Sequence, residues 1–406
     1  MKKRILSYLL GAFLITLLMI YFALKPIIPN PFGWNPLPEV SVQKQSIAQD
    51  EWAMPIKIAQ DTLARWQKKL SAPSLSVAVG HNNQILWSEA IGYADIPSGQ
   101  LANDLTVYRI GSISKSVTAV ALATLMDKNL LQTDDQLTTL LPDYELANAT
   151  ISVKQLASHT AGIRHYDPCW CMPIVKEAFS NQRYTSIKEA TRIFSQDALK
   201  FDPGTGFNYS TYGYTLLAGV IESVSQTSFL DYLQKAVLNT LDMQATHAGG
   251  TGKVIPNKAS FYQVKDGQYK KVVPMNISNK WAGGGLLSTP ADLVKMGNAL
   301  LDSTFLSETT KAQLFTPIPL NDGTMNPQNY AMGWRVDTSK RVYPTKEIKI
   351  IHHDGTISGG IALIILFPEY DLTVALMTNR SGSSRELFTP LYEIVKPFME
   401  KVEEAS

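Results

Sequence analysis

Segments with strand character lie near both ends of the globular part of this 406-residue chain, and a long helical middle separates them. Near the start, two alternating apolar runs flank Asn82-Asn83, a dipeptide that favours a hairpin turn. Strands at both ends that enclose a helical middle predict one α/β domain, an antiparallel sheet flanked by helices with a large helical insertion. Strands are expected at residues 75–79, 85–91, 330–336, 348–352, 360–367 and 372–378, and helices at 50–69, 112–129 and 385–401.

The charge balance excludes a nucleic-acid partner. The net charge is only +2, and Lys2, Lys3 and Arg4 account for part of it, so the rest of the chain is nearly neutral. A nucleic-acid-binding protein would carry a basic patch or stripe.

The two cysteines, Cys169 and Cys171, are too close in sequence to form an unstrained disulfide, so two thiols in a loop are expected, with a strained or redox-active pair as the alternative. The histidines show no metal-ligand spacing, and we predict no cofactor and no metal.

The N-terminal segment predicts a membrane anchor. Lys2, Lys3 and Arg4 precede an apolar run over residues 5–24, and about 20 helical residues span a hydrocarbon core of about 30 Å. The run ends without the small-residue cleavage site of a signal peptide. Because the basic cluster precedes the run, the N-terminus is expected in the cytoplasm. We therefore predict a cytoplasmic stub and single-pass inner-membrane anchor over residues 1–25 with a periplasmic catalytic domain; a secreted protein after signal cleavage is the alternative.

Two further segments follow the predicted anchor. Residues 26–49 are rich in proline and asparagine, which predicts an extended linker rather than a packed element. Residues 50–403 carry the globular pattern and are expected to form the catalytic domain. The sequence does not predict an oligomeric state.

The first motif with chemical content joins Ser112 to Lys115. On a helix, residues three apart share a face, so the ammonium group can reach the hydroxyl. Serine needs an adjacent base to act as a nucleophile, and a desolvated lysine can lose its proton near neutrality. The spacing alone is not specific, because Ser41 and Lys44 repeat it in the predicted linker. Gly111 before the serine and the apolar run after it place the pair at the start of a buried helix.

The second motif is Tyr209-Ser210-Thr211, which lies between a Pro-Gly turn and an apolar helical segment. A tyrosine on such a loop can pass a proton if a nearby cation lowers its pKa. Packing of the ring alone is the usual alternative for a single tyrosine.

The third motif, His353-Asp354-Gly355-Thr356, ends an apolar strand. Gly355 would let a substrate lie close to the strand edge. A backbone N–H at this edge could bind an oxyanion together with that of Ser112. For His353 alone, a buried core histidine with satisfied hydrogen bonds is the alternative.

In this order the three motifs resemble those of the serine beta-lactamase and penicillin-binding protein superfamily. Further segments fit the class C beta-lactamase-related group: Leu-Ala-Ser-His-Thr-Ala-Gly-Ile at 156–163, Ala-Gly-Gly-Gly-Leu-Leu-Ser-Thr at 282–289 and Tyr-Ala-Met-Gly-Trp at 330–334. Within that group, the Tyr-Ser-Thr form and residues 162–166 look most like the mitochondrial beta-lactamase-like serine proteases and their bacterial relatives. The resemblance covers about residues 50 to 400 and implies a beta-lactamase/transpeptidase-like fold.

The resemblance also implies catalytic roles. Ser112 would attack a carbonyl and become acylated, while Lys115 and Tyr209 would share the proton transfers. The backbone N–H groups of Ser112 and Thr356 would form the oxyanion hole. The expected function is therefore a serine hydrolase that acts on an amide or ester through an acyl-enzyme.

Departures from the family pattern affect the predicted substrate. Thr211, His353, Asp354 and Gly355 are the predicted substrate-binding residues, but Thr211 stands where the family often has asparagine and His353 where many members have lysine. A neutral histidine and an added carboxylate should bind the carboxylate of a beta-lactam less well. We therefore expect weak or no beta-lactamase activity and favour a peptidase, D-peptidase or amidase, or esterase acting on a small-molecule or peptide substrate.

Other functional classes fit less well. An α/β-hydrolase would carry a G-x-S-x-G elbow, which the sequence lacks. The segment Gly-Gly-Thr-Gly-Lys at 249–253 lacks the first glycine and the closing hydroxyl residue of a nucleotide-binding P-loop. A catalytically silent binding or scaffolding protein of the same fold remains the alternative. The presence of all three motif residues, Ser112, Lys115 and Tyr209, argues against it.

Overall fold

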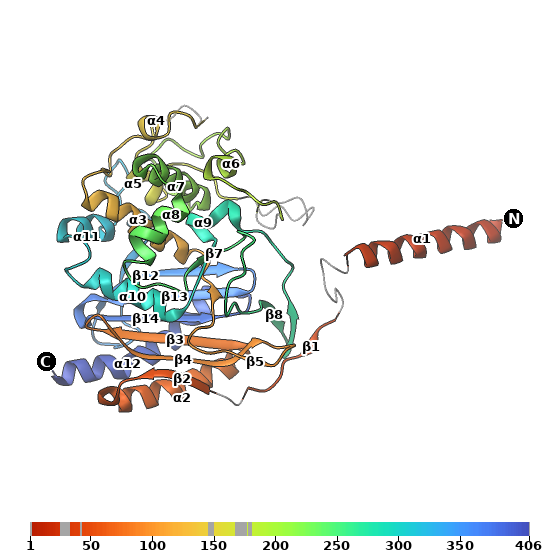
Figure 1. Ribbon diagram of the computed structural model, residues 1–406, viewed down its shortest axis with the longest axis horizontal. Helices are drawn as coiled ribbons and strands as arrows, with labels where there is room; N and C mark the ends of the chain where they lie inside the picture. The colour runs from red at the N-terminus through yellow and green to blue at the C-terminus, as the bar shows by residue number, and fades with distance from the viewer. Residues whose placement is uncertain are drawn as a thin grey trace.

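The computed structural model describes residues 2–24, 33–40, 43–144, 150–166, 177 and 181–405. Its centre is an antiparallel sheet with the strand order β11-β12-β13-β14-β3-β4-β2, and the short β5 pairs with β4 (Figure 1). The strands are β2 (Gln43–Ala48), β3 (Ser74–His81), β4 (Gln84–Asp95), β5 (Gln100–Leu101), β11 (Arg335–Ser339), β12 (Ile348–Ile357), β13 (Gly360–Phe367) and β14 (Leu372–Thr378).

The two ends of the chain meet in the middle of this sheet. β14 pairs with β3, and Val374 lies opposite Val79. The predicted hairpin is confirmed: Asn82 and Asn83 have φ values of 47° and 57°, which suit a tight turn with both central residues in the left-handed region. The prediction of one α/β domain with an antiparallel sheet and a helical insertion is therefore confirmed.

Helices cover both faces of the sheet (Figure 1). On one face lie α2 (Ala53–Lys69) and the C-terminal α12 (Phe388–Ala405), which pack against each other and against the sheet. On the other face lie α10 (Pro290–Leu301) and the helical insertion. Each interface has its own apolar cluster; the one beneath α2 and α12 includes Trp52, Leu63, Trp87, Phe367, Leu391 and Phe398.

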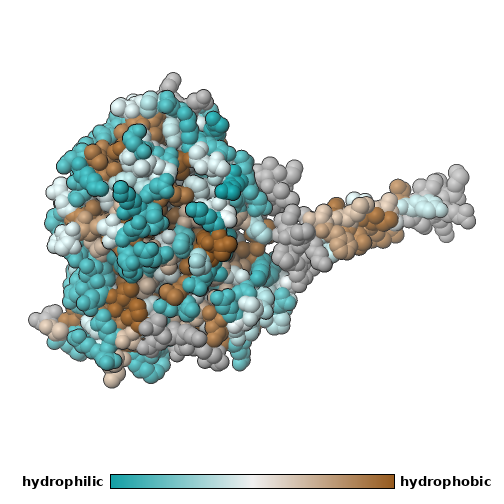
Figure 2. All heavy atoms as spheres, viewed as in Figure 1, coloured by the Kyte–Doolittle hydropathy of each residue, from teal (hydrophilic) through white to brown (hydrophobic). Residues whose placement is uncertain are grey.

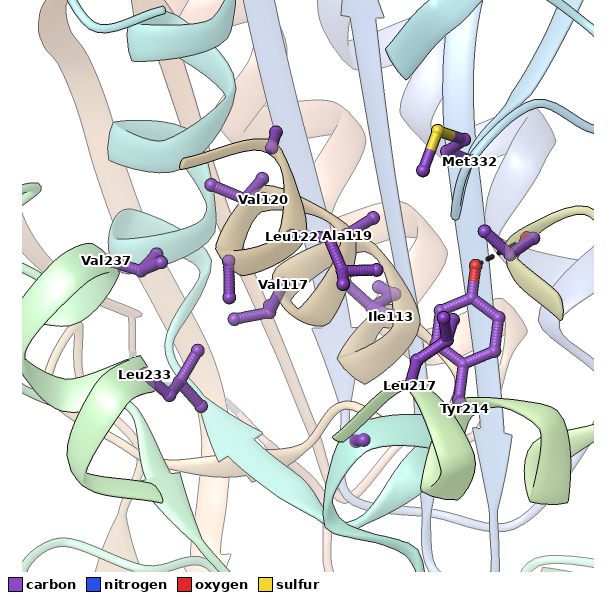
Figure 3. Packing of buried hydrophobic residues seen from close by; sticks show 14 of the residues in the cluster. Ile113, Val117, Ala119, Val120, Leu122, Tyr214, Leu217, Leu233, Val237 and Met332 are labelled. Atoms are coloured by element: carbon purple, nitrogen blue, oxygen red, sulfur yellow. Dashed lines mark hydrogen bonds between the residues drawn. The ribbon is translucent and has the colours of Figure 1, made fainter. Parts of the chain in front are cut away.

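The central helix of the insertion is α3 (Ile113–Asp127), in which every residue from Ile113 to Met126 is buried. A helix that is buried all round must be enclosed by other elements. Figure 3 shows apolar side chains of neighbouring elements, among them Leu217, Leu233 and Met332, gathered around it. The helical elements that contact α3 are α7 (Thr211–Ser225), α8 (Phe229–Leu233), η2 (Gln234–Leu238), α9 (Trp281–Gly284) and α11 (Glu308–Phe315). The elements that pack against α7 instead are α4 (Leu137–Leu140), α5 (Val153–Ala157), α6 (Ile187–Thr191) and η3 (Ser278–Lys280).

Two small sheets flank the main one. The first has the order β6-β10-β7, made of Tyr108–Arg109, Leu286–Ser288 and His247–Ala248, and it leads the chain into α3. The second has the order β1-β9-β8, made of Asn35–Pro36, Gln268–Lys271 and Tyr262–Lys265.

Part of the predicted linker is packed against the domain, so the prediction of a free spacer over residues 26–49 is wrong for its described parts. β1 pairs with β9, and the Lys270 ammonium lies 4.7 Å from the ring centroid of Trp34. β2 forms the edge strand beside β4. β1 is also an edge strand, and Pro36 suits this position because proline donates no backbone hydrogen bond.

The N-terminal helix α1 (Lys2–Leu24) projects away from the domain, and its apolar side chains, from Tyr8 to Phe22, are exposed (Figures 1 and 2). Among the residues that the structure describes, no helix combines the length and apolar composition needed to cross a bilayer. The transmembrane anchor predicted for residues 1–25 is thus not supported. Cys169 and Cys171, with their predicted thiol state, lie outside the described residues, as does Ser41.

Candidate active site

Ser112 lies at the N-cap of α3, directly after a left-handed turn at Gly111, whose φ is +50°. One helical turn on, Lys115 is completely buried, and its Nζ lies 3.2 Å from Ser112 Oγ. The structure thus brings the two predicted residues into hydrogen-bonding distance, as the i, i+3 spacing on a helix requires.

Lys115 has two further partners from distant parts of the chain. Its Nζ donates to the carbonyl oxygen of Gly283 at 2.5 Å and to Thr211 Oγ1 at 3.2 Å. Burial lowers its pKa well below the ordinary lysine value, and the positive charges of Arg335 and Lys280 add to this effect. A neutral amine has two N–H donors and one lone pair. With Gly283 and Thr211 as acceptors, the lone pair is left for the Ser112 hydroxyl.

Tyr209 is positioned by the start of α7. Ser210 caps this helix, because its Oγ accepts from the backbone N–H of Gly213 at 3.2 Å and donates to the carbonyl of Arg164 at 2.7 Å. The Tyr209 side chain is hydrogen-bonded to Ser112, and Nζ of Lys115 lies 4.6 Å from its ring centroid. Ser112 is therefore the shared partner of both predicted proton-transfer groups.

No nearby cation lowers the net pKa of Tyr209, so the condition stated for its role in proton transfer is not met in that form. Burial raises the pKa of Tyr209 well above the ordinary value, and it outweighs the opposing effects of Arg335 and of the hydrogen bond to Ser112. A phenol buried in this way stays protonated near neutrality and can act as a proton donor.

The third motif runs along β12 against the turn that leads into α3. An added Cβ on Gly355 would lie 1.9 Å from the carbonyl oxygen of Ile110 and 3.1 Å from the amide nitrogen of Ser112. An added Cβ on Gly111 would lie 2.9 Å from the amide nitrogen of Thr356. Only glycine permits such a close approach. It brings the backbone amides of Ser112 and Thr356, the two predicted oxyanion-hole donors, into the same region.

The sequence predicts that His353 binds substrate, but the structure places it as a buried histidine with both ring nitrogens hydrogen-bonded. It is fully buried, its Nδ1 donates to the carbonyl of Asp354 at 2.7 Å, and its Nε2 accepts from the Tyr330 hydroxyl at 2.8 Å. Burial also holds its pKa well below the usual value, so the ring is neutral, as expected. Because both nitrogens are engaged, the predicted side-chain contact with substrate is not supported. Its ring instead lies near Tyr209, at a centroid distance of 6.5 Å.

Thr211, predicted to contact the substrate, is also buried. Its hydroxyl bonds to Lys115, and its backbone N–H donates to Nδ1 of His165 at 3.2 Å. Its position therefore supports Lys115 rather than offering an exposed side chain to a substrate amide.

The carboxylate of Asp354 is not an unbalanced negative charge. Arg335 Nη1 donates to its Oδ1 at 2.9 Å, and the hydroxyl of Ser384 donates to its Oδ2 at 2.5 Å. Burial opposes ionisation, but the charge of Arg335 and the hydrogen bond from Ser384 lower the pKa of Asp354. Arg335 could not be identified from a local sequence motif, because its partner lies 19 residues away on the next strand.

Two histidines that the sequence argument left without a role hold the Tyr209 loop. His159 Nδ1 accepts from the backbone N–H of Ser210, and His165 Nδ1 accepts from that of Thr211, both at 3.2 Å. Burial lowers the pKa of His165 to about 3 and that of His159 well below its usual value, so both nitrogens stay available as acceptors. The sequence signal for His159 was its place in the segment 156–163.

A second buried lysine, Lys280, acts electrostatically on Lys115. An added Cβ on Gly284 would lie 3.9 Å from its Cδ, and burial together with Arg109 lowers its pKa to about 8. Within the described ranges, no group of three or more His, Cys, Asp or Glu side chains could hold a metal ion. The groups that the structure places around Ser112 are a buried amine, a phenol and backbone amides.

The Beta-lactamase family model matches residues 59–395. This chain belongs to the beta-lactamase family of serine hydrolases. It is 30% identical over 410 residues to the human mitochondrial serine beta-lactamase-like protein LACTB, covering 81% of this chain and 75% of that protein. It is 23% identical over 319 residues to penicillin-binding protein 4* of Bacillus subtilis, covering 75% of this chain and 68% of the relative.

Solved structures show the same fold. The D-amino acid amidase of Ochrobactrum anthropi, in complex with D-phenylalanine, matches with a TM-score of 0.70 and 22% identity, over 87% of this chain and all of the amidase. The octameric penicillin-binding protein homologue of Pyrococcus abyssi matches with a TM-score of 0.68 and 21% identity, over 84% of this chain and 76% of that chain.

Proposed function

We propose that this serine hydrolase cleaves an amide or ester bond through an acyl-enzyme on Ser112. The observation that carries the proposal is the arrangement of Lys115, which is buried, has its pKa lowered and lies between Ser112 Oγ, Thr211 Oγ1 and the carbonyl of Gly283. This arrangement supplies a base directly at a serine hydroxyl, as nucleophilic catalysis requires.

The acylation step follows from these positions. Neutral Lys115 takes the hydroxyl proton as Ser112 Oγ bonds to the carbonyl carbon, and the carbonyl electron pair moves onto its oxygen. The amides of Ser112 and Thr356 donate to that oxyanion. When the adduct collapses, the bond to the leaving nitrogen or oxygen breaks, the phenol of Tyr209 protonates the leaving atom, and the proton on Lys115 returns to Tyr209. Water then releases the acyl group by the reverse sequence.

The preferred substrate in this proposal is a peptide, amide or ester rather than a beta-lactam. His353 is buried and neutral where many family members carry lysine, and Arg335 is already paired with Asp354. Neither His353 nor Arg335 therefore supplies a free positive charge for the carboxylate of a beta-lactam. One of the solved structures with this fold is a D-amino acid amidase, which is consistent with an amide substrate.

A fluorophosphonate probe tests the nucleophile. We expect stoichiometric labelling of the wild-type protein and none of Ser112→Ala. Ser114→Ala is the matched control, because this neighbouring hydroxyl donates to the carbonyl of Gly111 and is buried. Equal labelling of wild type and Ser112→Ala would contradict the proposal by showing another nucleophile, and no labelling of wild type would leave a silent protein of the same fold. Hydrolysis assays with D-amino acid amides, dipeptides and p-nitrophenyl esters would then identify the substrate class.

We further propose that the domain works outside the cytoplasm, at the periplasmic side of an inner membrane or after secretion. This rests on the order of basic residues 2–4 and the apolar run that follows them. Fractionation of a Gram-negative host that expresses the full chain checks it. Recovery of the protein only in the cytosolic fraction would contradict the proposal.

A further inference from the structure

Arg335 and Asp354 form an ion pair at the edge of the candidate active site. Arg335 begins β11 and lies opposite His352, whereas Asp354 lies on β12 in the third motif. The distance from Nη1 to Oδ1 is 2.9 Å. Both side chains make further hydrogen bonds. Nε and Nη2 of Arg335 donate to Gln328 Oε1 at 3.1 and 2.8 Å, and the Ser384 hydroxyl donates to Oδ2 of Asp354. The two charges therefore have fixed positions.

The positive charge of this pair lies close to Tyr209, the proposed proton donor. The Cζ atom of Arg335 lies 5.8 Å from the ring centroid of Tyr209 and 5.4 Å from that of Tyr330. The side chains of Arg335 and Asp354 are only 18% and 26% exposed, so water screens them poorly. A charge fixed at such a distance in a partly buried site acts strongly on its neighbours.

We infer that Arg335 and Asp354 act as paired positioning residues for proton transfer, in which the arginine favours the neutral, base-competent form of Lys115 and the aspartate limits that effect. The inference rests on the proposed function. It assigns a role to an arginine outside the three sequence motifs, and it gives Asp354 a role other than repelling the carboxylate of a substrate.

The directions of the individual effects agree with this inference. After burial, Arg335 is the largest influence that lowers the pKa of Lys115, while Asp354 raises it. The same two residues act with the same opposite signs on Tyr209.

The other groups around Lys115 differ from this pair. Lys280 also lowers the pKa of Lys115. His159, His165 and His353 have pKa values far below the usual histidine value and are neutral. The neighbouring phenols of Tyr209 and Tyr214 stay protonated, because burial raises their pKa values. Arg335 and Asp354 are thus the oppositely charged pair whose separate removal should have opposite effects.

The pH dependence of fluorophosphonate labelling tests this, because it needs no knowledge of the natural substrate. The acidic limb of the rate profile reports protonation of the base. In Arg335→Gln the limb should move to higher pH by about one unit or more, as expected for loss of a unit charge from a partly buried site. In Asp354→Asn it should move to lower pH. Arg335→Lys, which keeps the charge, and the double variant Arg335→Gln/Asp354→Asn should both lie near wild type.

A purely structural role would lower the rates without moving the limb, and this outcome in both single variants would overturn the inference. If Arg335→Gln fails to fold, as judged by circular dichroism, the shift in Asp354→Asn decides the question. A wild-type protein that is not labelled at all would instead contradict the proposed function. In that case the Lys115 ¹³Cε chemical shift, assigned by comparison with Lys115→Arg, still reports whether the two substitutions move its titration in opposite directions.

Discussion

The Nδ1 atom of His159 accepts a hydrogen bond from the backbone N–H of Ser210, the residue directly after Tyr209. The imidazole also packs against the Tyr209 ring at a centroid distance of 4.3 Å and against Tyr330 at 4.5 Å. One buried side chain thus fixes both the backbone and the ring of a proposed proton donor. The position of Tyr209 relative to Ser112 therefore depends on His159, which makes no hydrogen bond to Ser112 Oγ.

Replacement of His159 by alanine should slow fluorophosphonate labelling of Ser112 at least about tenfold and destabilise the protein by about 2–4 kcal/mol, because it leaves a cavity and an unpaired buried N–H. In His159→Asn, Oδ1 can take over the role of Nδ1, so the labelling rate should partly recover. Fluorophosphonate labelling quenched at a series of times measures the rate, and urea denaturation measures the stability. Equal rates in both variants would show that the accepted hydrogen bond does not position Tyr209.

Replacement of Lys115 by methionine should lower the labelling rate at least about 100-fold, since a general base contributes about that much or more. Its free energy of unfolding should stay equal or rise by about 1 kcal/mol, because the burial penalty of the amine disappears. Chemical denaturation at neutral pH checks stability. A large loss of both activity and stability would mean that the lysine is structural.

Lys115 should also make the stability of the protein depend on pH. Its pKa is lowered on folding, so between the folded and unfolded values the unfolded chain binds more protons. Stability from this group should therefore increase as the pH rises from the folded pKa toward the ordinary lysine value of about 10.4, and decrease as the pH falls. Lys115→Met should remove this contribution, which urea denaturation at a series of alkaline pH values measures against wild type.

Gly355→Ala should abolish labelling and cost about 2–4 kcal/mol of stability, because the new methyl group collides with the backbone at Ile110. Gly213→Ala is the matched control, since an added Cβ there meets nothing closer than 3.6 Å within helix α7. This control should be neutral or stabilise the protein by up to about 1 kcal/mol. Thermal unfolding and labelling of both variants test the close approach of β12 to α3.

Steady-state hydrolysis of nitrocefin should be slow or undetectable, because the site offers no free cation at the third motif for the carboxylate of the substrate. The comparison is with a dedicated beta-lactamase under identical conditions. Comparable turnover would contradict the proposed preference for peptides, amides or esters. An acyl-enzyme that forms with nitrocefin but hydrolyses slowly, detected by mass spectrometry, would agree with it.

The parts of the fold that the sequence predicted are those in which local pattern and burial agree. β13 and β14 have the predicted bounds because their apolar runs are buried. The strand expected at 330–336 begins only at Arg335, because Gly333 adopts a φ of +78° and turns the chain. β12 extends through the third motif to Ile357, since pairing with β13 stabilises residues whose own composition suggests a turn.

The contacts of the candidate site likewise fall into local ones, which the sequence predicts, and long-range ones, which it does not. The contact between Ser112 and Lys115 follows from helix geometry within one turn and was predictable. The contacts of Lys115 with Gly283 and of His159 with Ser210 join segments 168 and 51 residues apart. No local pattern encodes such pairs, because they depend on how α3, α7 and α9 pack against one another. The same holds for Arg335, whose role emerges only from the register of β11 on β12.

The pairing of β14 with β3 has a consequence for biosynthesis. The hairpin β3–β4 emerges early from the ribosome, but its partner strand follows almost 300 residues later. Contacts so distant along the chain form late. Because Gly355 and Thr356 also lie in that late segment, Ser112 cannot acquire its strand-edge neighbours before nearly the whole polypeptide has been made. Ser112 is therefore expected to be inactive in the nascent chain until β12 has been synthesised.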